Sequence, residues 1–322
     1  MGNILITGGT GFVGSHMVDY ILKYAIKPDQ KVYCTKRWME DTKNLDHINH
    51  DSFEYIDCDL LDGMSVKRAV KISKPEKVFH FAAQSFPEVS FKIPVITLQT
   101  NIIGTTHLLE SIKESDYDPT IVSVSSSEVY GNPNEDEIPI TETNPIRPAN
   151  PYSISKVGHD LMSQYYHKAY GMKIITTRMF SHEGARRGKQ FALSSFAYQI
   201  AKNEKLKGDG VVKHGNLDSV RTYNHIEDAI QAYWLCSNSD KYGEVYNIGG
   251  DYTCTVGEAL DMLISKSTKN HTKELDPERV RPTDITLQIP SSDKFRKDFG
   301  WRPQKSLTHI CDDLLDYWRK LL

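Results

Sequence analysis

Two short segments of the sequence carry side chains that can move protons. Residues 123–131, SVSSSEVYG, place serine hydroxyls beside a carboxylate, and residues 151–156, PYSISK, place Tyr152 four residues before Lys156. In a helix, residues four apart lie on one face, and an ammonium near a tyrosine hydroxyl favours the tyrosine anion. Such a tyrosine can take a proton from a hydroxyl group. Because this spacing also arises by chance on exposed helix faces, its meaning depends on the other motifs.

A glycine-rich segment near the start of the chain predicts a dinucleotide site. Residues 6–15, ITGGTGFVGS, space three glycines as G-x-x-G-x-x-G, after an apolar run and before a helix-like segment. Glycines allow a tight turn and close approach to a pyrophosphate, and the helix start offers free amides to the anion. A glycine turn without a ligand is the weaker alternative, given this context. The expected contacts are Gly8, Thr10, Gly11, Phe12, Val13 and Gly14.

The end of the next apolar run favours NADP over NAD. NAD-specific domains place an acidic residue about 20 residues after the glycines, where it binds the ribose hydroxyls. Here the run ends CTKRW, so Lys36 and Arg37 occupy that place. A cation suits a 2′-phosphate, although two solvated surface charges are the alternative. Further cofactor contacts are expected after the following runs, at Asp59, Leu60, Ala82, Ala83 and Gln84.

The elements that must position these motifs alternate along the first part of the chain. Nearly continuous apolar runs occupy 4–7, 31–35, 53–57, 77–83, 121–125, 173–180 and 244–250. Runs of this kind are typical of parallel strands buried on both faces. With helices expected at 12–24, 92–115 and 151–169, they predict an α/β fold, a Rossmann-type doubly wound parallel sheet. A smaller mixed α/β lobe should follow, ending in an amphipathic helix.

The domain boundaries follow from a change in composition near residue 180, after which charged and glycine-rich segments such as SHEGARRGKQ appear. We expect a dinucleotide-binding domain over 1–180, with a return segment near 222–247. Residues 181–221 and 248–322 would form the substrate-binding lobe.

Composition excludes some other classes of protein. A net charge of −3 over 322 residues gives no basic footprint for nucleic acid. No apolar run approaches the roughly 20 residues that span a membrane, and the first residues do not resemble a signal peptide. The five cysteines are scattered without a C-x-x-C spacing, so neither zinc nor a disulfide framework is expected. We expect a cytoplasmic protein with no nucleic-acid or membrane partner.

The order of the three motifs resembles the extended short-chain dehydrogenase/reductase family over essentially the whole chain. The resemblance implies that Ser126 hydrogen-bonds a substrate hydroxyl beside Tyr152 and Lys156. The sugar nucleotide 4,6-dehydratases of that family add a glutamate two places after the hydroxyl residue, and Glu128 matches it. Glu128 would then act as the base at carbon 5 and assist the departure of water. Reductases of the family can also carry this glutamate, and a capping or surface role is a further alternative.

Several segments resemble the GDP-mannose 4,6-dehydratase branch, namely AAQSFPEVSFKIP, MFSHEGARRG, GNLDSVRTYNHIEDA and VRPTDI. The resemblance implies that His182 and Arg187 lie at the cofactor and that Arg221 and Arg281 hold the nucleotide diphosphate. The remaining expected substrate contacts are Ser85, Ser126, Ser181, Glu183, Arg186 and Asp284. Since Ser181 replaces the asparagine of the branch, the sugar stays open among GDP-mannose, GDP-N-acetylglucosamine and GDP-heptose.

Three functions compete at this point. The first is a GDP-sugar 4,6-dehydratase with a tightly bound NADP that is regenerated in each turnover. The second is a GDP-4-keto-sugar reductase or epimerase of the same fold. The third, a non-catalytic NADP sensor, is disfavoured because Ser126, Glu128, Tyr152 and Lys156 are all present. The resemblance also implies a homodimer through helices near 92–115 and 151–169, or a homotetramer through the loop KRWMEDTKN.

Overall fold

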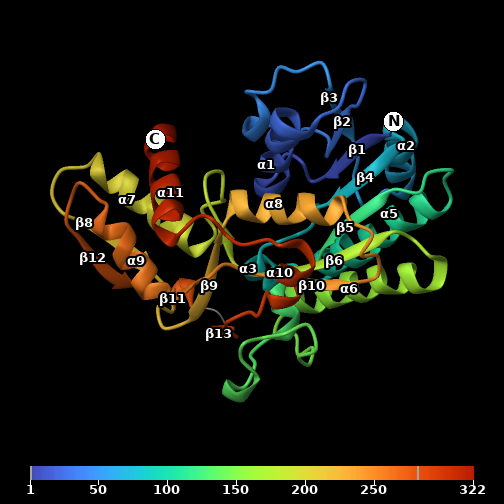
Figure 1. Cartoon of the computed structure of the whole chain (residues 1–322). Coiled ribbons are helices and arrows are strands. Elements are labelled where there is room, and N and C mark those ends of the chain that lie inside the picture. The colour runs from blue at the N-terminus through green and yellow to red at the C-terminus, as the bar shows by residue number, and fades with distance from the viewer. Residues whose placement is uncertain (1, 281–282) are drawn as a thin grey trace. The chain divides into compact units, whose positions relative to one another are not determined.

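The chain folds into two compact units in a computed structural model that describes residues 2–280 and 283–322 (Figure 1). The first unit contains residues up to 129, 150–178 and 230–246, and the second contains 130–149, 179–229 and 247–322. Residues 130–149 therefore join the second unit, whereas the sequence placed them in the first domain. The reason is long-range hydrogen bonding. The Asn132 side chain donates to the Asp284 carbonyl at 2.9 Å and accepts from the Thr286 amide at 2.7 Å.

The first unit is built on a seven-stranded parallel sheet with the order β10-β6-β5-β4-β1-β2-β3. This is the Rossmann order, with the chain crossing over after three strands, so the predicted fold class is confirmed. The strands are β1 (Asn3–Thr7), β2 (Val32–Lys36), β3 (Phe53–Asp57), β4 (Pro75–His80), β5 (Thr120–Val124), β6 (Ile174–Met179) and β10 (Val245–Ile248). Strand β4 ends three residues earlier than expected, which leaves 81–83 in the loop beyond the sheet.

Helices cover both faces of this sheet because its strands are apolar on both sides. Successive residues of β4 point to opposite faces. Val78 packs with α2, α5 and α6, whereas the Phe79 ring lies 6.2 Å from that of Trp234 in α8. The helices are α1 (Phe12–Tyr20), α2 (Gly63–Ser73), α3 (Pro87–Lys92), α4 (Pro94–Leu98), α5 (Gly104–Lys113), α6 (Pro151–Tyr170) and α8 (Ile226–Ser237). The segment expected as one helix over 92–115 is interrupted by a π-helical turn at Gln99–Ile103.

The second unit has its own small sheets and core. Strand β9 lies between β11 and β13 and also pairs with β7, while β8 and β12 pair in parallel. Its elements are β7 (His182–Glu183), α7 (Ala192–Glu204), β8 (Gly210–His214), β9 (Val220–His225), β11 (Tyr252–Thr255), α9 (Val256–Ser265), β12 (His271–Leu275), β13 (Leu287–Gln288), α10 (Asp293–Phe299) and α11 (Leu307–Leu321). The expected C-terminal amphipathic helix, α11, packs Ile310 and Leu314 against Phe196 of α7 and Leu260 of α9.

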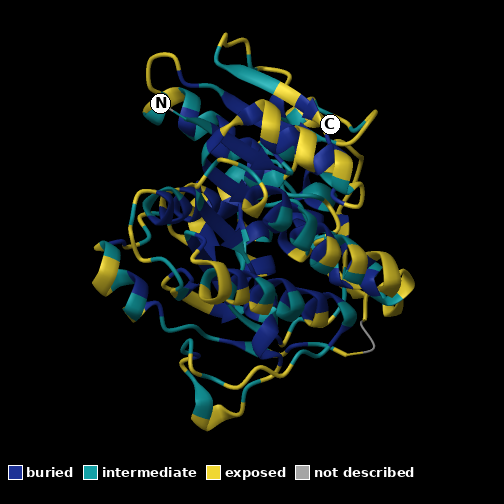
Figure 2. Ribbon diagram, turned by 90° about the vertical axis from the view of Figure 1, so that its right-hand side faces the viewer, coloured by how far each residue is buried: buried dark blue, intermediate teal, exposed yellow. Residues whose placement is uncertain are grey.

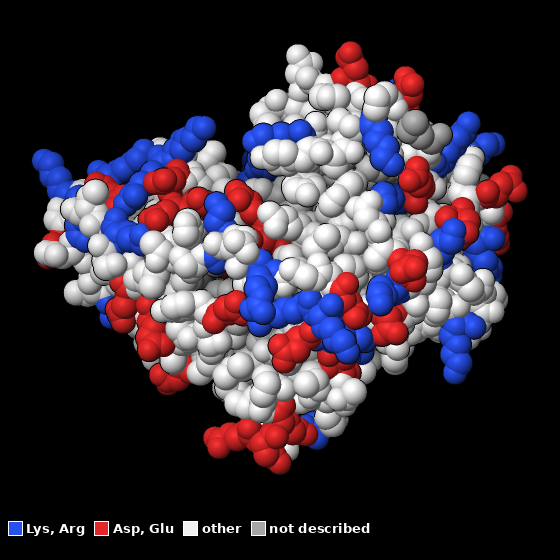
Figure 3. Space-filling view, viewed as in Figure 1, with Lys and Arg blue, Asp and Glu red and all other residues white. Residues whose placement is uncertain are grey.

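Burial and charge follow the expected pattern. In Figure 2 the strands of the large sheet are mostly buried, whereas the helices expose one side. On the face drawn in Figure 3, acidic and basic side chains are interspersed. Within residues 2–280 and 283–322, no helix combines the length and apolarity needed to cross a bilayer. All five cysteines are buried free thiols, and burial raises the pKa of Cys34 and Cys311 to about 12.

Candidate active site

The glycine-rich loop joins β1 to α1 with a backbone that side chains would obstruct. Gly8 has φ +69°, and its carbonyl accepts the Gly11 amide at 3.1 Å. A Cβ atom on Gly14 would lie 2.3 Å from the Gly8 carbonyl oxygen, so the loop can close onto the helix only with glycine there. Gly11 is the N-cap of α1 and has no side chain that caps the first amides. This geometry fits the pyrophosphate of a dinucleotide.

A hollow of about 510 Å³ lies at the carboxyl ends of β2 and β3. Of the predicted cofactor residues, Arg37 and Asp59 line it. The Lys36 ammonium instead lies 2.7 Å from the Asp57 carboxylate on the neighbouring strand, and Leu60 is buried against Gly104. The full lining is Arg37, Trp38, Met39, Glu40, Asp57, Cys58, Asp59, Asp62, Ser65 and Arg68. Its size and position suit the adenosine end of a dinucleotide.

Sequence reasoning missed Glu40, an acidic group in this hollow. The strand end itself has no acid, but a turn with Met39 at φ +58° brings Glu40 back toward the glycine loop. Its carboxylate accepts the Thr10 hydroxyl at 3.1 Å and the Arg37 amide at 2.8 Å. A left-handed turn formed without glycine leaves little signal in a sequence, so nothing in CTKRWME revealed this return.

The loop after β4 approaches the glycine loop closely. The Ala82 amide donates to the Thr7 hydroxyl at 3.2 Å, and a Cβ atom on Gly8 would lie 2.8 Å from the Ala82 Cα. The Gln84 side chain points inward, donating to Thr97 at 3.1 Å, and Ser85 is exposed. Ala83 follows in the same loop and is half-buried. The small residue at 82 therefore allows this loop to pack closely against the glycine loop.

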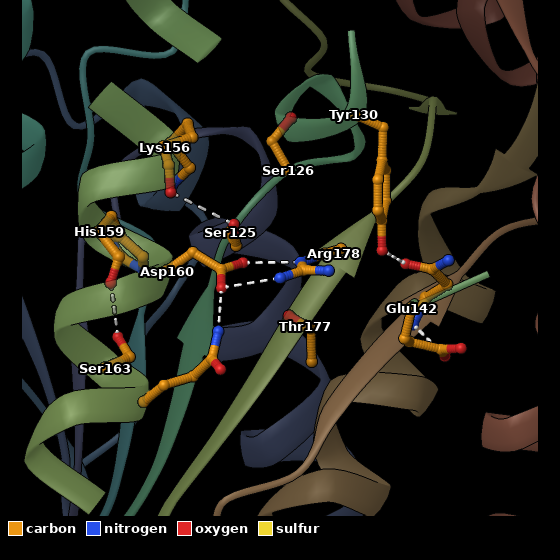
Figure 4. A network of polar contacts seen from close by, with 12 residues as sticks. Ser125, Ser126, Tyr130, Glu142, Lys156, His159, Asp160, Ser163, Thr177 and Arg178 are labelled. Carbon is orange, nitrogen blue, oxygen red and sulfur yellow. Dashed lines mark hydrogen bonds and ion pairs between the residues drawn. The ribbon is translucent and has the colours of Figure 1, made fainter. Parts of the chain in front are cut away.

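The predicted catalytic residues Ser126, Tyr152 and Lys156 are all buried, at the end of β5 and in the first turns of α6. The Lys156 ammonium donates to the Val124 carbonyl, which holds the helix against the strand end. Burial lowers the pKa of Lys156 to about 8, although the Asp160 carboxylate opposes that shift. Figure 4 shows Ser126 and Lys156 on these facing elements. These residues thus lie at the end of one strand and in the first turns of the helix that packs against it.

Glu128 is half-buried in the short 3₁₀ turn that follows β5, Ser127–Tyr130. Its backbone amide donates to the Ser126 hydroxyl at 3.2 Å, and its carboxylate accepts the Asn150 side-chain amide at 3.0 Å. Asn150 is the N-cap of α6, and its side-chain oxygen accepts the Ser153 amide at 2.8 Å. The helix cap is therefore Asn150. Sequence reasoning missed this residue, although an Asn before a Pro at a helix start is a capping signal.

A buried ion pair lies one turn beyond Lys156 in α6. Arg178 of β6 donates to the two Asp160 carboxylate oxygens at 2.9 and 3.1 Å, and their side chains are 5% and 0% exposed (Figure 4). Burial of this kind is tolerated only when both charges are paired. The pair anchors α6 to the sheet.

A chain of buried neutral groups runs from β1 through β4 to α5 and α6. His80 contacts Thr7 at 2.7 Å and Thr105 at 2.9 Å, and Thr105 contacts His159 at 2.9 Å. Burial lowers the pKa of His80 to about 3 and that of His159 well below its usual value, so both rings are neutral. The chain links the strand before the glycine loop to the helix that carries Tyr152.

In the second unit, the segment after β6 brings three of the predicted residues together. His182 contacts the Phe180 carbonyl at 3.0 Å, and burial lowers its pKa to about 3. Glu183 is buried with a raised pKa, 3.5 Å from the Arg187 guanidinium, which stacks 3.3 Å from the centre of the Phe191 ring. Arg186 has φ +68°, an uncommon conformation for a residue other than glycine. Ser181 precedes them and is half-buried.

Arg221 and Asp284, predicted at the nucleotide, also lie together in the second unit. The guanidinium lies 3.9 Å from the carboxylate and donates to the Ile285 carbonyl. The Ser219 hydroxyl, which sequence reasoning missed, donates to Asp284 at 2.9 Å. Arg281 lies outside the described residues.

Comparison with known proteins assigns the family. Residues 5–314 match the family described as GDP-mannose 4,6 dehydratase. The chain belongs to this family. It is 27% identical to a GDP-mannose 4,6-dehydratase of Yersinia enterocolitica, over 98% of this chain and 93% of that protein. It is also 27% identical to a dTDP-glucose 4,6-dehydratase of Shigella flexneri (94% and 89%) and 26% identical to a GDP-6-deoxy-D-mannose reductase of Pseudomonas aeruginosa (98% and 96%).

Solved structures of similar proteins share the fold over the full length. A dTDP-glucose 4,6-dehydratase from Bacillus anthracis in complex with NAD has a TM-score of 0.84 and 25% identity, covering 99% of this chain and 97% of that one. The protein RMD from Pseudomonas aeruginosa, complexed with NADPH, has a TM-score of 0.81 and 23% identity, covering 100% of both chains. The family member described here is thus an enzyme of the sugar-nucleotide dehydratase type, and its relatives differ in nucleotide.

Proposed function

We propose that this family member is a GDP-sugar 4,6-dehydratase that uses a tightly bound nicotinamide dinucleotide. The observation that carries the proposal is the placement of Glu128. The Glu128 carboxylate accepts the Asn150 side-chain amide, and the Glu128 backbone amide donates to the Ser126 hydroxyl. Glu128 follows β5, the strand against which Lys156 holds α6, and α6 also carries Tyr152. A simple epimerase needs the hydroxyl, the tyrosine and the lysine, whereas water loss needs an additional base.

The first step is oxidation at carbon 4. Tyr152 takes the proton of the carbon 4 hydroxyl while Ser126 hydrogen-bonds the same oxygen. Lys156, with a pKa of about 8, is mainly protonated at pH 7 and stabilises the Tyr152 anion. The nicotinamide, when bound, supplies the hydride acceptor for carbon 4 and the hydride donor for carbon 6.

The second step is elimination of water. A ketone at carbon 4 makes the hydrogen on carbon 5 acidic, and Glu128 takes it as a proton. The electron pair of that bond forms a carbon 5–carbon 6 double bond, and the carbon 6 oxygen leaves as water after receiving the proton from Glu128. A hydride at carbon 6 and a proton at carbon 5 would complete the reaction. The sugar has lost one water and the cofactor is unchanged.

We propose NADP as the cofactor, because Arg37 and Arg68 both line the hollow where a 2′-phosphate would lie. Glu40 in the same hollow is the feature that favours NAD, since an acid there can bind ribose hydroxyls. Relatives of known structure carry either cofactor. Denaturing the purified protein and weighing the released dinucleotide by mass spectrometry decides between them.

Most of the proposed contacts to the sugar nucleotide lie in the second unit, and Ser85 and Ser126 lie in the first. Arg221, backed by Asp284, would bind the diphosphate, and a guanidinium suits phosphate because it can donate two parallel hydrogen bonds. His182 and Arg187 are also proposed as cofactor contacts. The other residues proposed at the substrate are Ser85, Ser126, Ser181, Glu183, Arg186 and Arg281. The proposal of guanine as the base depends on the family match alone. A relative named dTDP-glucose 4,6-dehydratase is as similar to this chain as one named GDP-mannose 4,6-dehydratase.

We also propose a homodimer through α4, α5 and α6. Helices α4 and α6 and the turn between α4 and α5 expose apolar side chains, with Val95 62%, Ile103 46%, Leu161 50% and Tyr165 52% exposed. The loop proposed for a tetramer carries Trp38 and Met39, 78% and 84% exposed. Light scattering of the wild type, Leu161→Asp and Trp38→Ser measures each contribution. A monomeric wild type contradicts the proposal.

The test of the reaction adds no cofactor. The purified protein is incubated separately with GDP-mannose, GDP-N-acetylglucosamine, GDP-heptose and dTDP-glucose, and each mixture is weighed for the loss of one water. We expect loss from a GDP-sugar. Turnover only with a 4-keto sugar and added NADPH would support the reductase instead. The observation that favours this alternative is the similarity to the GDP-6-deoxy-D-mannose reductase of Pseudomonas aeruginosa.

A further inference from the structure

Asn150 makes two hydrogen bonds that serve two different structures. Its side-chain oxygen accepts the Ser153 amide at 2.8 Å, which caps α6, and its side-chain nitrogen donates to the Glu128 carboxylate at 3.0 Å. Asn150 is 7% exposed, so these bonds form largely away from water. The two functions belong to opposite ends of one amide group.

The cap alone does not require asparagine. Serine and aspartate cap helices about as well, because each supplies the oxygen that accepts the N2 or N3 amide. Aspartate has no donor for Glu128, and the serine hydroxyl is one bond shorter than the asparagine side chain, so its O–H does not take the place of the Nδ2–H group. The Ser153 hydroxyl already completes the capping box by accepting the backbone N–H of Asn150 at 2.9 Å. The side-chain NH₂ of Asn150 has no part in the capping box and is available for Glu128.

We infer that Asn150 is a positioning residue for Glu128, fixing its carboxylate relative to the helix that carries Tyr152. The inference rests on the proposed dehydratase function. Asn150 is two residues before Tyr152, so one amide couples the base for carbon 5 to the group that acts at carbon 4. A second anchor for Glu128 is its own amide, bonded to the Ser126 hydroxyl at 3.2 Å.

The coupling has a kinetic signature, because the two steps use different groups. Oxidation at carbon 4 depends on Tyr152 and Lys156, whereas water loss depends on Glu128. Losing a hydrogen bond to a charged group costs about 10- to 100-fold in an equilibrium or a rate. That loss should fall on elimination and spare oxidation.

The experiment compares Asn150→Ser and Asn150→Asp with the wild-type holoenzyme on the GDP-sugar that it dehydrates. Stopped-flow absorbance follows reduced nicotinamide, which reports oxidation, and mass spectrometry follows water loss. We expect reduced nicotinamide to form at the wild-type rate and to accumulate, while water loss falls about 10- to 100-fold. Asn134→Ser is the matched control, since Asn134 is also part of a capping box but lies on an exposed 3₁₀ turn.

Thermal unfolding and the ratio of the two rates separate the outcomes. If both steps fall together and unfolding shifts to lower temperature, Asn150 is only a helix cap and the inference is overturned. Unchanged rates in both variants overturn it as well. A wild-type protein that oxidises carbon 4 but releases no water overturns the proposed function itself, because Glu128 then has no proton to remove.

Discussion

Two regions of the first unit handle charge in opposite ways. At the end of β5 and the start of α6, Lys156, Asp160 and Arg178 are almost fully buried and bonded to the backbone or to each other. In the hollow after β2 and β3, Arg37 is 68% exposed and pairs with Glu40, and Lys36 pairs with Asp57, which is 47% exposed. Buried partners cannot be replaced by water, whereas exposed ones can. The first region should therefore respond to small chemical changes, and the second mainly to the charge of its ligand.

The largest effect is expected from removing one oxygen atom in the buried region. Tyr152→Phe should lower turnover by about 10²- to 10⁴-fold, the usual contribution of a positioned acid or base. Cofactor content should be unchanged, as measured on the denatured protein. Tyr165→Phe is the control, because Tyr165 lies on the same helix but is 52% exposed. Equal losses in the two variants would contradict a catalytic role for Tyr152.

The ion pairs of the two regions should differ in stability. Asp160→Asn leaves Arg178 buried without its counter-charge, and we expect a loss of about 3–5 kcal/mol in the free energy of unfolding. Asp57→Asn, in the hollow, should cost about 0–1 kcal/mol. Urea denaturation measures both. Similar values for the two variants would remove the contrast between the regions.

The buried lysine predicts a pH dependence of stability. In the folded protein the pKa of Lys156 is about 8, below its usual 10.5. Between these values the unfolded chain binds more protons, so the free energy of unfolding rises with pH across that window. Lys156→Met has no ammonium at this position, so it lacks this contribution to the pH dependence. From pH 8 to pH 10, wild type should gain stability relative to Lys156→Met, as measured by urea denaturation at each pH, and parallel curves would contradict it.

The smallest effect on function is expected in the hollow. Arg37→Ala should weaken NADP binding by about 10-fold, since a charged hydrogen bond is worth about 1.5–3 kcal/mol and solvent screens an exposed one. NAD binding and stability should be unchanged. Calorimetric titration of the cofactor-free protein with each dinucleotide measures this. A parallel loss of NAD affinity would instead place Arg37 at a group that both cofactors share.

Much of the sheet and part of the site were readable in the chain. Strands such as β4 and β5 are apolar on both faces, which marks them without knowledge of their neighbours. The glycine loop was readable because a Cβ atom at Gly14 would meet the Gly8 carbonyl, which leaves the sequence no choice. The start of α6 was also marked, since Asn150 and Pro151 are a capping residue and a first-turn proline.

Other features depended on contacts between distant residues. Asp160 and Arg178 are 18 residues apart, and nothing in either segment names the other as its partner. Glu40 returns to Thr10 through a left-handed turn that its neighbours do not signal. Residues 130–149 join the second unit through bonds of Asn132 to residues about 150 positions later.

The sequence by itself determined the alternation of strands and helices along the first part of the chain, the glycine loop and the residue types that can do the chemistry, because these follow from local periodicity and sterics. Only the tertiary structure decided which side chains meet. It placed Glu128 on the amide of Asn150, lowered the pKa of Lys156 by burying it, and put an acid beside two arginines in the hollow. Hydrogen bonds and desolvation act through space, so the positions that share them cannot be read from spacing along the chain.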